Sequence, residues 1–171
     1  MLYHHRITEK GFGKETMAIE KVRAYFKNFG KDGDVQEFTV SSATVELAAL
    51  ALGVDGARIA KSMSFYPKEG EGCIIVVTAG DKKVDNGKFK RQFAMKAKML
   101  QGGDVETLTG YAPGGVCPFA NPVNTKVYLD ESLKRFDTVF PACGSANSAI
   151  ELTCEELFQF AEALGWVDVC K

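Results

Sequence analysis

The uncharged run Cys73–Ala79, CIIVVTA, constrains the fold more than any other segment. Its branched side chains are typical of a strand. A strand with apolar side chains on both faces lies inside a sheet that is covered on both sides. The sequence therefore predicts a central strand here, entered through a turn around Gly70 and Gly72.

The segment Ala57–Tyr66 alternates instead, as a strand with two different faces does. Ser62 and Ser64 share one face. The other face carries a lysine among apolar residues, and its members are Ile59, Lys61, Met63 and Phe65. This alternation predicts that the Lys61 side chain leaves the strand from its apolar face.

Periodicity and capping residues predict the remaining elements. We expect helices at Ala18–Phe29, at Val45–Leu52, within 81–101, at Glu106–Thr109 and at Glu155–Leu164. We expect strands at Val35–Val40, Lys126–Asp130, Thr138–Pro141 and Ile150–Leu152. Ser42 or Thr44 can cap the second helix, and Thr153 with Glu156 fits a capping box. Because helices and strands alternate irregularly, an α+β fold is favoured over a doubly wound sheet.

The length of 171 residues suits one domain that buries its own core. Residues 1–16 are polar and interrupted by glycine, and Met17 resembles a second start. We expect 1–16 to be an N-terminal extension with a tendency to disorder, and 17–171 to be the domain. A membrane span and a secretory signal are not expected, since no apolar run has the required length or flanks.

Several classes of chemistry lack their residues. His4 and His5 are the only histidines and stand side by side at the N-terminus, so a His-based catalytic triad or metal site is not expected. The usual phosphate-binding glycine motifs are absent. The five cysteines include no C-x-x-C pair, which favours reduced thiols and a cytosolic location. We expect no cofactor and no metal.

The net charge of −1 hides a local excess of positive charge. Between Asp81 and Lys98, two acids accompany seven bases, which are Lys82, Lys83, Lys88, Lys90, Arg91, Lys96 and Lys98. Such a cluster can be a solvated helix face or can contact a nucleic-acid backbone.

Two features remain as candidate chemistry. Lys61 can extend toward water from the end of its strand, or its ammonium can anchor a carbonyl or carboxylate oxygen at the floor of a pocket. The stretch 110–119, GYAPGGVCPF, can be a structural turn. Its glycines can equally let the backbone approach a small ligand and present N–H groups to it.

At these residues the chain resembles the YbaK/EbsC family of aminoacyl-tRNA deacylases, which includes the editing domain of prolyl-tRNA synthetase. The resemblance extends from Met17 to the C-terminus in unbroken order. Its segments are ARIAKSMSF, IIVVTAGDKKVD, LTGYAPGGVCPF, KVYLDESL and FPACGSANSAIELT. It implies a mixed, mostly antiparallel, barrel-like sheet surrounded by helices.

The resemblance also implies an activity and a set of site residues. The protein would be a free-standing, cytoplasmic trans-editing hydrolase that removes a small amino acid, such as alanine or cysteine, from proline tRNA. Lys61 would be the catalytic anchor, water the nucleophile, and prolyl-tRNA synthetase a possible partner, with no role for DNA or membranes. The implied substrate-binding residues are Ser62, Gly114, Gly115, Val116, Pro118 and Gly144, and the implied tRNA-binding residues are Lys82, Lys83, Lys88, Lys90 and Arg91.

Some alternatives stay open. Ala142, Cys143 and Ala149 stand where relatives that act on cysteinyl-tRNA tend to carry Ser and Asp, and the histidine typical of alanyl-specific members is absent, so the amino acid is not fixed. A nucleophilic cysteine at 117 or 143 is disfavoured, because no base is available to form the thiolate. A binding module for tRNA or a synthetase, or a sensor of a free amino acid, would use the same pocket without catalysis.

Overall fold

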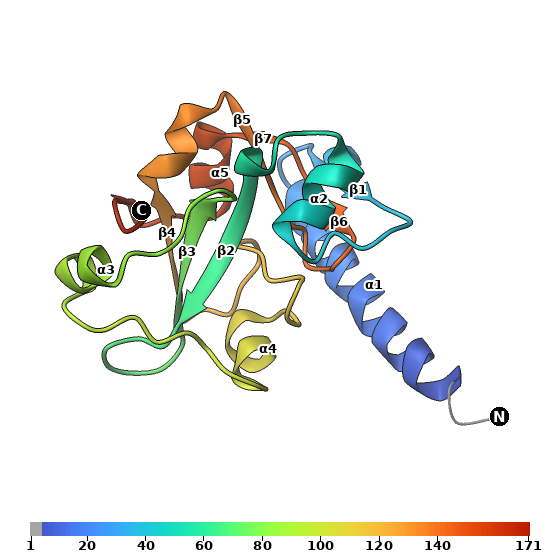
Figure 1. Cartoon of the computed structure of the whole chain (residues 1–171). Coiled ribbons are helices and arrows are strands. Elements are labelled where there is room, and N and C mark those ends of the chain that lie inside the picture. Colours follow the sequence, from blue (N-terminus) through green and yellow to red (C-terminus); the bar gives the residue numbers. More distant parts are fainter. Residues whose placement is uncertain (1–4) are drawn as a thin grey trace.

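The computed structural model describes residues 5–171, and its centre is a six-stranded sheet (Figure 1). The strand order is β7-β5-β2-β3-β4-β8. The strands are β2 (Ile59–Phe65), β3 (Cys73–Ala79), β4 (Thr125–Asp130), β5 (Thr138–Pro141), β7 (Leu152–Thr153) and β8 (Trp166–Val167). A separate antiparallel pair joins β1 (Gln36–Glu37) to β6 (Ser148–Ala149).

The central strand β3 is buried along its whole length, as the uncharged run predicted. Its alternate side chains enter two different clusters. Ile75 and Val77 belong to the main core, which also contains residues of α1 and of the 111–119 segment. Ile74 and Val76 belong to a second core with Phe89 of α3. The β2–β3 pair therefore has a main-core face and an α3 face.

The helices cover these two faces from opposite sides. The helices are α1 (His5–Lys27), α2 (Val45–Leu52), α3 (Asn86–Phe93), α4 (Asp104–Thr109) and α5 (Cys154–Phe160). Figure 1 shows α3 on one side of the β2–β3 pair and α1 and α2 on the other. Short 3-10 turns lie at Asp32–Asp34, Gly56–Arg58 and Glu131–Arg135.

The α+β class and the curled, barrel-like sheet are confirmed. The strand pairings are more evenly mixed than the expected mostly antiparallel sheet. β2–β3 and β5–β7 are antiparallel, whereas β2–β5, β3–β4 and β4–β8 are parallel. A parallel neighbour requires a long crossover, and the connection from β3 to β4 contains α3 and α4. Such distant pairings leave no local signal in the sequence.

Local signals placed several element ends correctly. The helix Val45–Leu52 has the predicted bounds, since Thr44 caps its start and Gly53 ends it with a φ of 68°. Thr153 and Glu156 form the predicted capping box of α5. That helix ends at Phe160 rather than Leu164, because the Leu164 N–H instead pairs with the Val127 carbonyl.

Three other predicted elements differ more from the structure. The strand expected at Ile150–Leu152 is replaced by two short strands, β6 and β7, because the chain bends at Ile150 to leave β1 and join β5. Only Gln36 and Glu37 of Val35–Val40 form a strand, since their partner β6 is equally short. The first helix begins at His5 rather than Ala18.

The longer first helix bears on the expected extension. Residues 5–16 continue α1, and residues 1–4 lie outside the described residues. The division into an extension and a domain at Met17 stays a prediction.

Candidate active site

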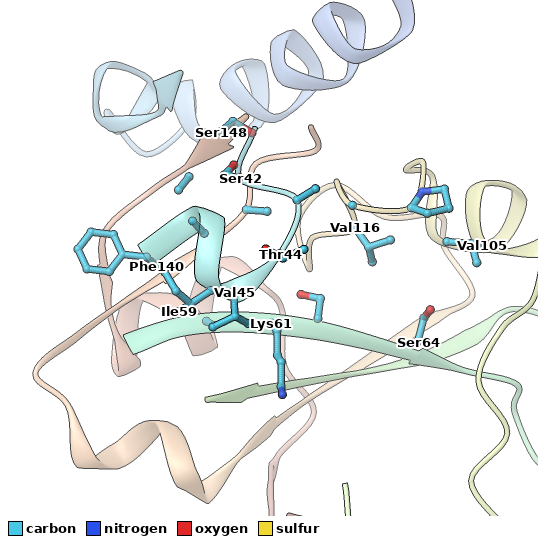
Figure 2. A pocket seen from close by; sticks show the side chains of 18 of the residues that line it. Ser42, Thr44, Val45, Ile59, Lys61, Ser64, Val105, Val116, Phe140 and Ser148 are labelled. Carbon is cyan, nitrogen blue, oxygen red and sulfur yellow. The ribbon is translucent and has the colours of Figure 1, made fainter. Parts of the chain in front are cut away.

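A pocket of about 370 Å³ lies against the main-core face of β2 (Figure 2). Its walls come from five parts of the chain. They are residues 42–48, β2, Met99 with Leu100 and Val105, the 113–116 turn, and the segment from Phe140 to Ala149. In the described part of the chain, no residue of the α3 core lines it. The pocket is therefore separate from the α3 core.

The glycine-rich stretch forms one wall through a tight turn. The Gly115 N–H donates to the Ala112 carbonyl at 3.0 Å, with Pro113 and Gly114 between them. Gly114 has a φ of 89°, which the third position of a type II turn requires. Among the described residues, the N–H groups of Gly114 and Val116 have no hydrogen-bond partner. Two unpaired main-chain donors thus lie on residues that line the pocket.

The second predicted glycine segment packs directly against this turn. A Cβ on Gly115 would come within 2.7 Å of the Gly144 carbonyl oxygen and 2.8 Å of the Ser145 Cα. Gly144 has a φ of 93°, and a Cβ there would lie 2.8 Å from the Tyr111 ring. The structure therefore brings these segments together, with Gly115 and Gly144 permitting close backbone contact rather than lining the pocket.

Hydrogen bonds hold the 143–149 loop in place. The Ser145 hydroxyl donates to the Ser148 hydroxyl at 2.8 Å, and that hydroxyl accepts from the Cys143 N–H at 3.3 Å. The Asn147 amide donates to the Phe38 carbonyl at 3.0 Å. The loop is thereby tied to the chain that leads into α2, and Ser148 of this network lines the pocket.

Ser62 contributes the buried polar group of the β2 wall. It lines the pocket, and its hydroxyl is buried without a hydrogen-bond partner among the described residues. Burying an unpaired hydroxyl costs free energy of about 1–3 kcal/mol. A group of this kind in a pocket marks a place where a ligand can supply the missing partner.

Lys61 lies next to Ser62 but its ammonium is on the opposite side of β2. Figure 2 shows the Lys61 nitrogen pointing away from Ser42, Thr44 and Val116. The ammonium donates to the Lys82 carbonyl. The predicted alternation is confirmed, since Met63 and Phe65 belong to the α3 core. An anchor at the pocket floor would face the glycine turn, and the Lys61 ammonium does not.

Titratable groups are almost absent from the pocket wall. Lys61 is the one ionisable residue that lines it in the described chain. Burial raises the pKa of Cys117 to about 12 and raises that of Cys143 well above its usual value. Neither thiol can therefore form a thiolate readily near neutral pH, which argues against a cysteine nucleophile.

The other predicted residues lie elsewhere. Pro118 is buried and lines a different cavity, with Tyr25 and Phe160. The predicted tRNA-binding residues lie on or before α3, on the far face of the sheet. Lys88 is paired with Asp168 at 2.9 Å, whereas Lys90 and Arg91 are exposed.

Three polar residues of the wall were not predicted as site residues, namely Ser42, Thr44 and Ser148. Ser42 and Thr44 were considered only as helix caps. Ser64 was placed correctly on the face of Ser62, and the pocket extends along both. The segments SSAT and GSANSA are rich in small and hydroxyl residues, and this composition could have indicated the three residues. Small side chains suit a pocket wall in which the backbone lies close to the ligand.

Among the described residues, no group of three or more His, Cys, Asp or Glu side chains could hold a metal ion. Within the same residues, no helix has both the length and the hydrophobicity for a bilayer crossing.

Comparison with known proteins places this pocket in a functional context. Residues 39–160 match the family model described as "Aminoacyl-tRNA editing domain". The chain is 53% identical to the uncharacterized protein YwhH of Bacillus subtilis, covering 91% of this chain and 98% of the relative. It is 29% identical to the "Putative Cys-tRNA(Pro)/Cys-tRNA(Cys) deacylase EbsC" of Enterococcus faecalis, over 70% of this chain and 76% of the relative.

A solved structure shares the fold. It is described as "a putative trans-editing enzyme for prolyl tRNA synthetase", with 27% identity and a TM-score of 0.80 over 90% of this chain and 97% of that chain. The matched region includes β2, the glycine turn and the 143–149 loop, so it contains the whole pocket. The chain belongs to the aminoacyl-tRNA editing domain family.

Proposed function

We propose that the protein is a free-standing, cytoplasmic trans-editing enzyme that hydrolyses the ester of a small amino acid on a mischarged tRNA, with proline tRNA as the substrate implied by the relatives. The observation that carries the proposal is the pocket itself. It combines small walls with unpaired donors and contains almost no titratable group.

The shape of the pocket suits a second sieve. Many wall residues are small, including Ala43, Ala48, Ala60, Ala142 and Ala149. A synthetase discriminates poorly against a slightly smaller amino acid, by about 10- to 200-fold for one methylene. A separate pocket that admits only the smaller residue can remove the error after the charging step.

The donors suit hydrolysis by positioning. The N–H groups of Gly114 and Val116 would bind the ester carbonyl and stabilise the negative charge that develops on its oxygen. The Ser62 hydroxyl would satisfy its hydrogen bond on the same group or on the ribose. Water attacks the carbonyl carbon, the ester C–O bond breaks, and the ribose oxygen takes up a proton.

The tRNA would supply the group that orients the water. Since no Asp, Glu or His lines the pocket in the described chain, a neighbouring ribose hydroxyl is the suitable candidate. Holding ester and water in a reactive geometry can itself lower the barrier by several kcal/mol. A carboxylate or imidazole base is then unnecessary.

Lys61 has one of two roles, a direct anchor of the substrate or a positioning residue, and an experiment distinguishes them. A direct anchor requires the ammonium to leave the Lys82 carbonyl and pass around β2. β2 pairs with β5 only at Ile59 and Ala60, so no strand lies beside Lys61 on that edge. A positioning residue would instead hold the turn after β3 and so fix the β2 wall from behind.

The test is release of amino acids from a panel of mischarged tRNAs by the wild-type protein and by Lys61→Ala, Lys61→Met and Lys61→Arg. The proposal fails if the wild-type protein releases none of them. A direct anchor predicts a loss of kcat in all three variants. A positioning role predicts that Lys61→Arg, which can still donate to the Lys82 carbonyl, retains most of the activity.

The basic residues of α3 complete the proposal as contacts to the body of the tRNA. Lys90 and Arg91 are exposed and project from the face opposite the pocket. Charge reversal of Lys88, Lys90 and Arg91 should reduce the salt dependence of tRNA binding. An unchanged slope would remove these residues from the tRNA interface.

A further inference from the structure

The pocket has one closed end and one open end. At the closed end lie Ile59, Phe140 and Ala48, whose exposed fractions are 6%, 6% and 7%. At the other end Met99 is 48% exposed and Pro113 is exposed. Figure 2 shows Ile59 and Phe140 at one end and Ser64 and Val105 at the other. A small side chain suits the closed end, and the open end at Met99 and Pro113 offers the rest of a tRNA substrate a way out of the pocket.

The chain beyond α3 returns to this open end. It pairs with the end of β2 through an antiparallel bridge between Phe65 and Met99. The Tyr66 N–H donates to the Lys98 carbonyl at 2.9 Å, and the Leu100 N–H donates to the Ser64 carbonyl at 3.0 Å. Lys98 is therefore opposite Tyr66, and Leu100 is opposite Ser64.

Opposite residues of an antiparallel pair project to the same face. Lys98 and Leu100 thus share the face of Ser62 and Ser64, which is the face of the pocket. The contacts agree, because the Lys98 ammonium lies 5.2 Å from the centre of the Tyr66 ring. Met95 and Ala97, of the other parity, pack in the α3 core, whereas Met99 of that parity is exposed at the open end of the pocket. Lys96 lies two residues before Lys98 and is also exposed.

The two lysines are available to an anion. Both are exposed, and no ion pair involves either of them within residues 5–171. The nearby Asp104 carboxylate already accepts from the Tyr66 hydroxyl at 2.5 Å. From Ser62 to Tyr66 the strand rises by about 13 Å. An adenosine and the phosphate that joins it to the preceding nucleotide can span such a separation.

We propose, on the basis of the proposed function, that Lys98 and Lys96 bind the phosphates beside the terminal adenosine of the tRNA, and that the 3′ end enters the pocket past the Ser64–Leu100 pair. The substrate-binding cation on the pocket face is then Lys98, whereas the Lys61 ammonium lies on the α3 face. The single-stranded end approaches along the 96–100 segment, and the α3 lysines contact other parts of the tRNA.

The test compares two substrates and two charge reversals. The substrates are a mischarged tRNA and the same amino acid esterified to adenosine alone, which lacks phosphates. The variant is Lys96→Glu/Lys98→Glu. The matched control is Lys27→Glu/Lys126→Glu, which reverses two exposed lysines outside the pocket and the basic cluster. We expect kcat/KM for the tRNA to fall at least tenfold in the variant only, with kcat/KM for the adenosine ester within twofold of wild type.

A binding measurement separates this inference from the activity. An RNA hairpin that carries the single-stranded 3′ end of tRNA is compared with one that lacks its last two nucleotides. The wild-type protein should bind the complete hairpin at least fivefold more tightly. The Lys96→Glu/Lys98→Glu variant should lose this preference. The dependence of its log binding constant on log salt concentration should also become shallower by about 1.4, as expected for the loss of two phosphate contacts.

The inference is overturned if the variant keeps both the wild-type preference and the wild-type slope. It is also overturned if reversal of Lys90 and Arg91 removes the preference and reversal of Lys96 and Lys98 does not. A wild-type protein that hydrolyses neither substrate would refute the proposed function, and the hairpin preference would still decide where the RNA end binds.

Discussion

The two faces of the β2–β3 pair are built for different purposes. The α3 face is packed with aromatic rings: Phe65, Phe89 and Phe93 lie in sequence with centroids 4.7 and 4.6 Å apart. The pocket face carries hydroxyl and small side chains, and within residues 5–171 one hydroxyl and two backbone N–H groups on it have no partner. The comparison teaches that one strand can provide stability on one side and a reactive surface on the other, at the cost of unsatisfied polar groups on the second.

The largest expected effect tests the stabilising face. Phe89 is fully buried between Phe65 and Phe93, so Phe89→Ala should lower the free energy of unfolding by about 3–5 kcal/mol. Deacylation per folded molecule should stay within a few fold of wild type, because Phe89 does not line the pocket. Denaturant unfolding and single-turnover deacylation measure the two quantities. A selective loss of activity at unchanged stability would refute the division between the faces.

The next effect tests the glycine turn on the reactive face. Gly115→Ala would place a methyl group 2.7 Å from the Gly144 carbonyl oxygen, and backbone cannot yield as a side chain can. Stability should fall by about 1–3 kcal/mol, and activity should fall more than this loss explains, because the N–H groups of the turn would move. Gly103→Ala is the control, since nothing lies within 4 Å of its Cβ position and its φ is −65°. Equal results for both glycines would contradict the tight packing of the turn.

Replacing Ser62 should change stability by less than the glycine substitution does, and stability should rise while activity falls. Ser62→Ala removes a buried hydroxyl without a partner, so stability should rise by about 1 kcal/mol. Deacylation should fall about 100-fold if that hydroxyl binds the transition state. Thr125→Val is the control for activity, because it removes the second buried hydroxyl without a partner in the described chain, which lies on β4 and does not line the pocket. A stable and fully active Ser62→Ala protein would exclude Ser62 from the reaction.

The same comparison shows what could be predicted from the sequence. Alternation in β2 already predicted that the side chains of Lys61 and Ser62 leave the strand in opposite directions. Which face held the pocket was set by contacts between distant segments, such as Gly115 against Gly144. The caps at Thr44 and Thr153 are local, and the structure has both. The parallel pairing of β3 with β4 and the bend at Ile150 depend on tertiary contacts, which a local pattern does not encode.

The smallest expected effect concerns pH and thiol reagents. Burial raises the pKa of Cys117 to about 12 and also raises the pKa of Cys143. Both thiols therefore stay protonated from pH 5 to 9 in the folded protein. Raised thiol pKa values favour folding at neutral pH, and this contribution is lost only as the pH rises past the ordinary thiol pKa of about 8.5, where the unfolded chain ionises. The rate of deacylation between pH 5 and 9 should therefore show no inflection from a cysteine, and iodoacetamide should leave the native protein active. A thiol-dependent limb in this range, abolished by Cys117→Ala, would mean that the reactive face uses a protein nucleophile instead of positioning water.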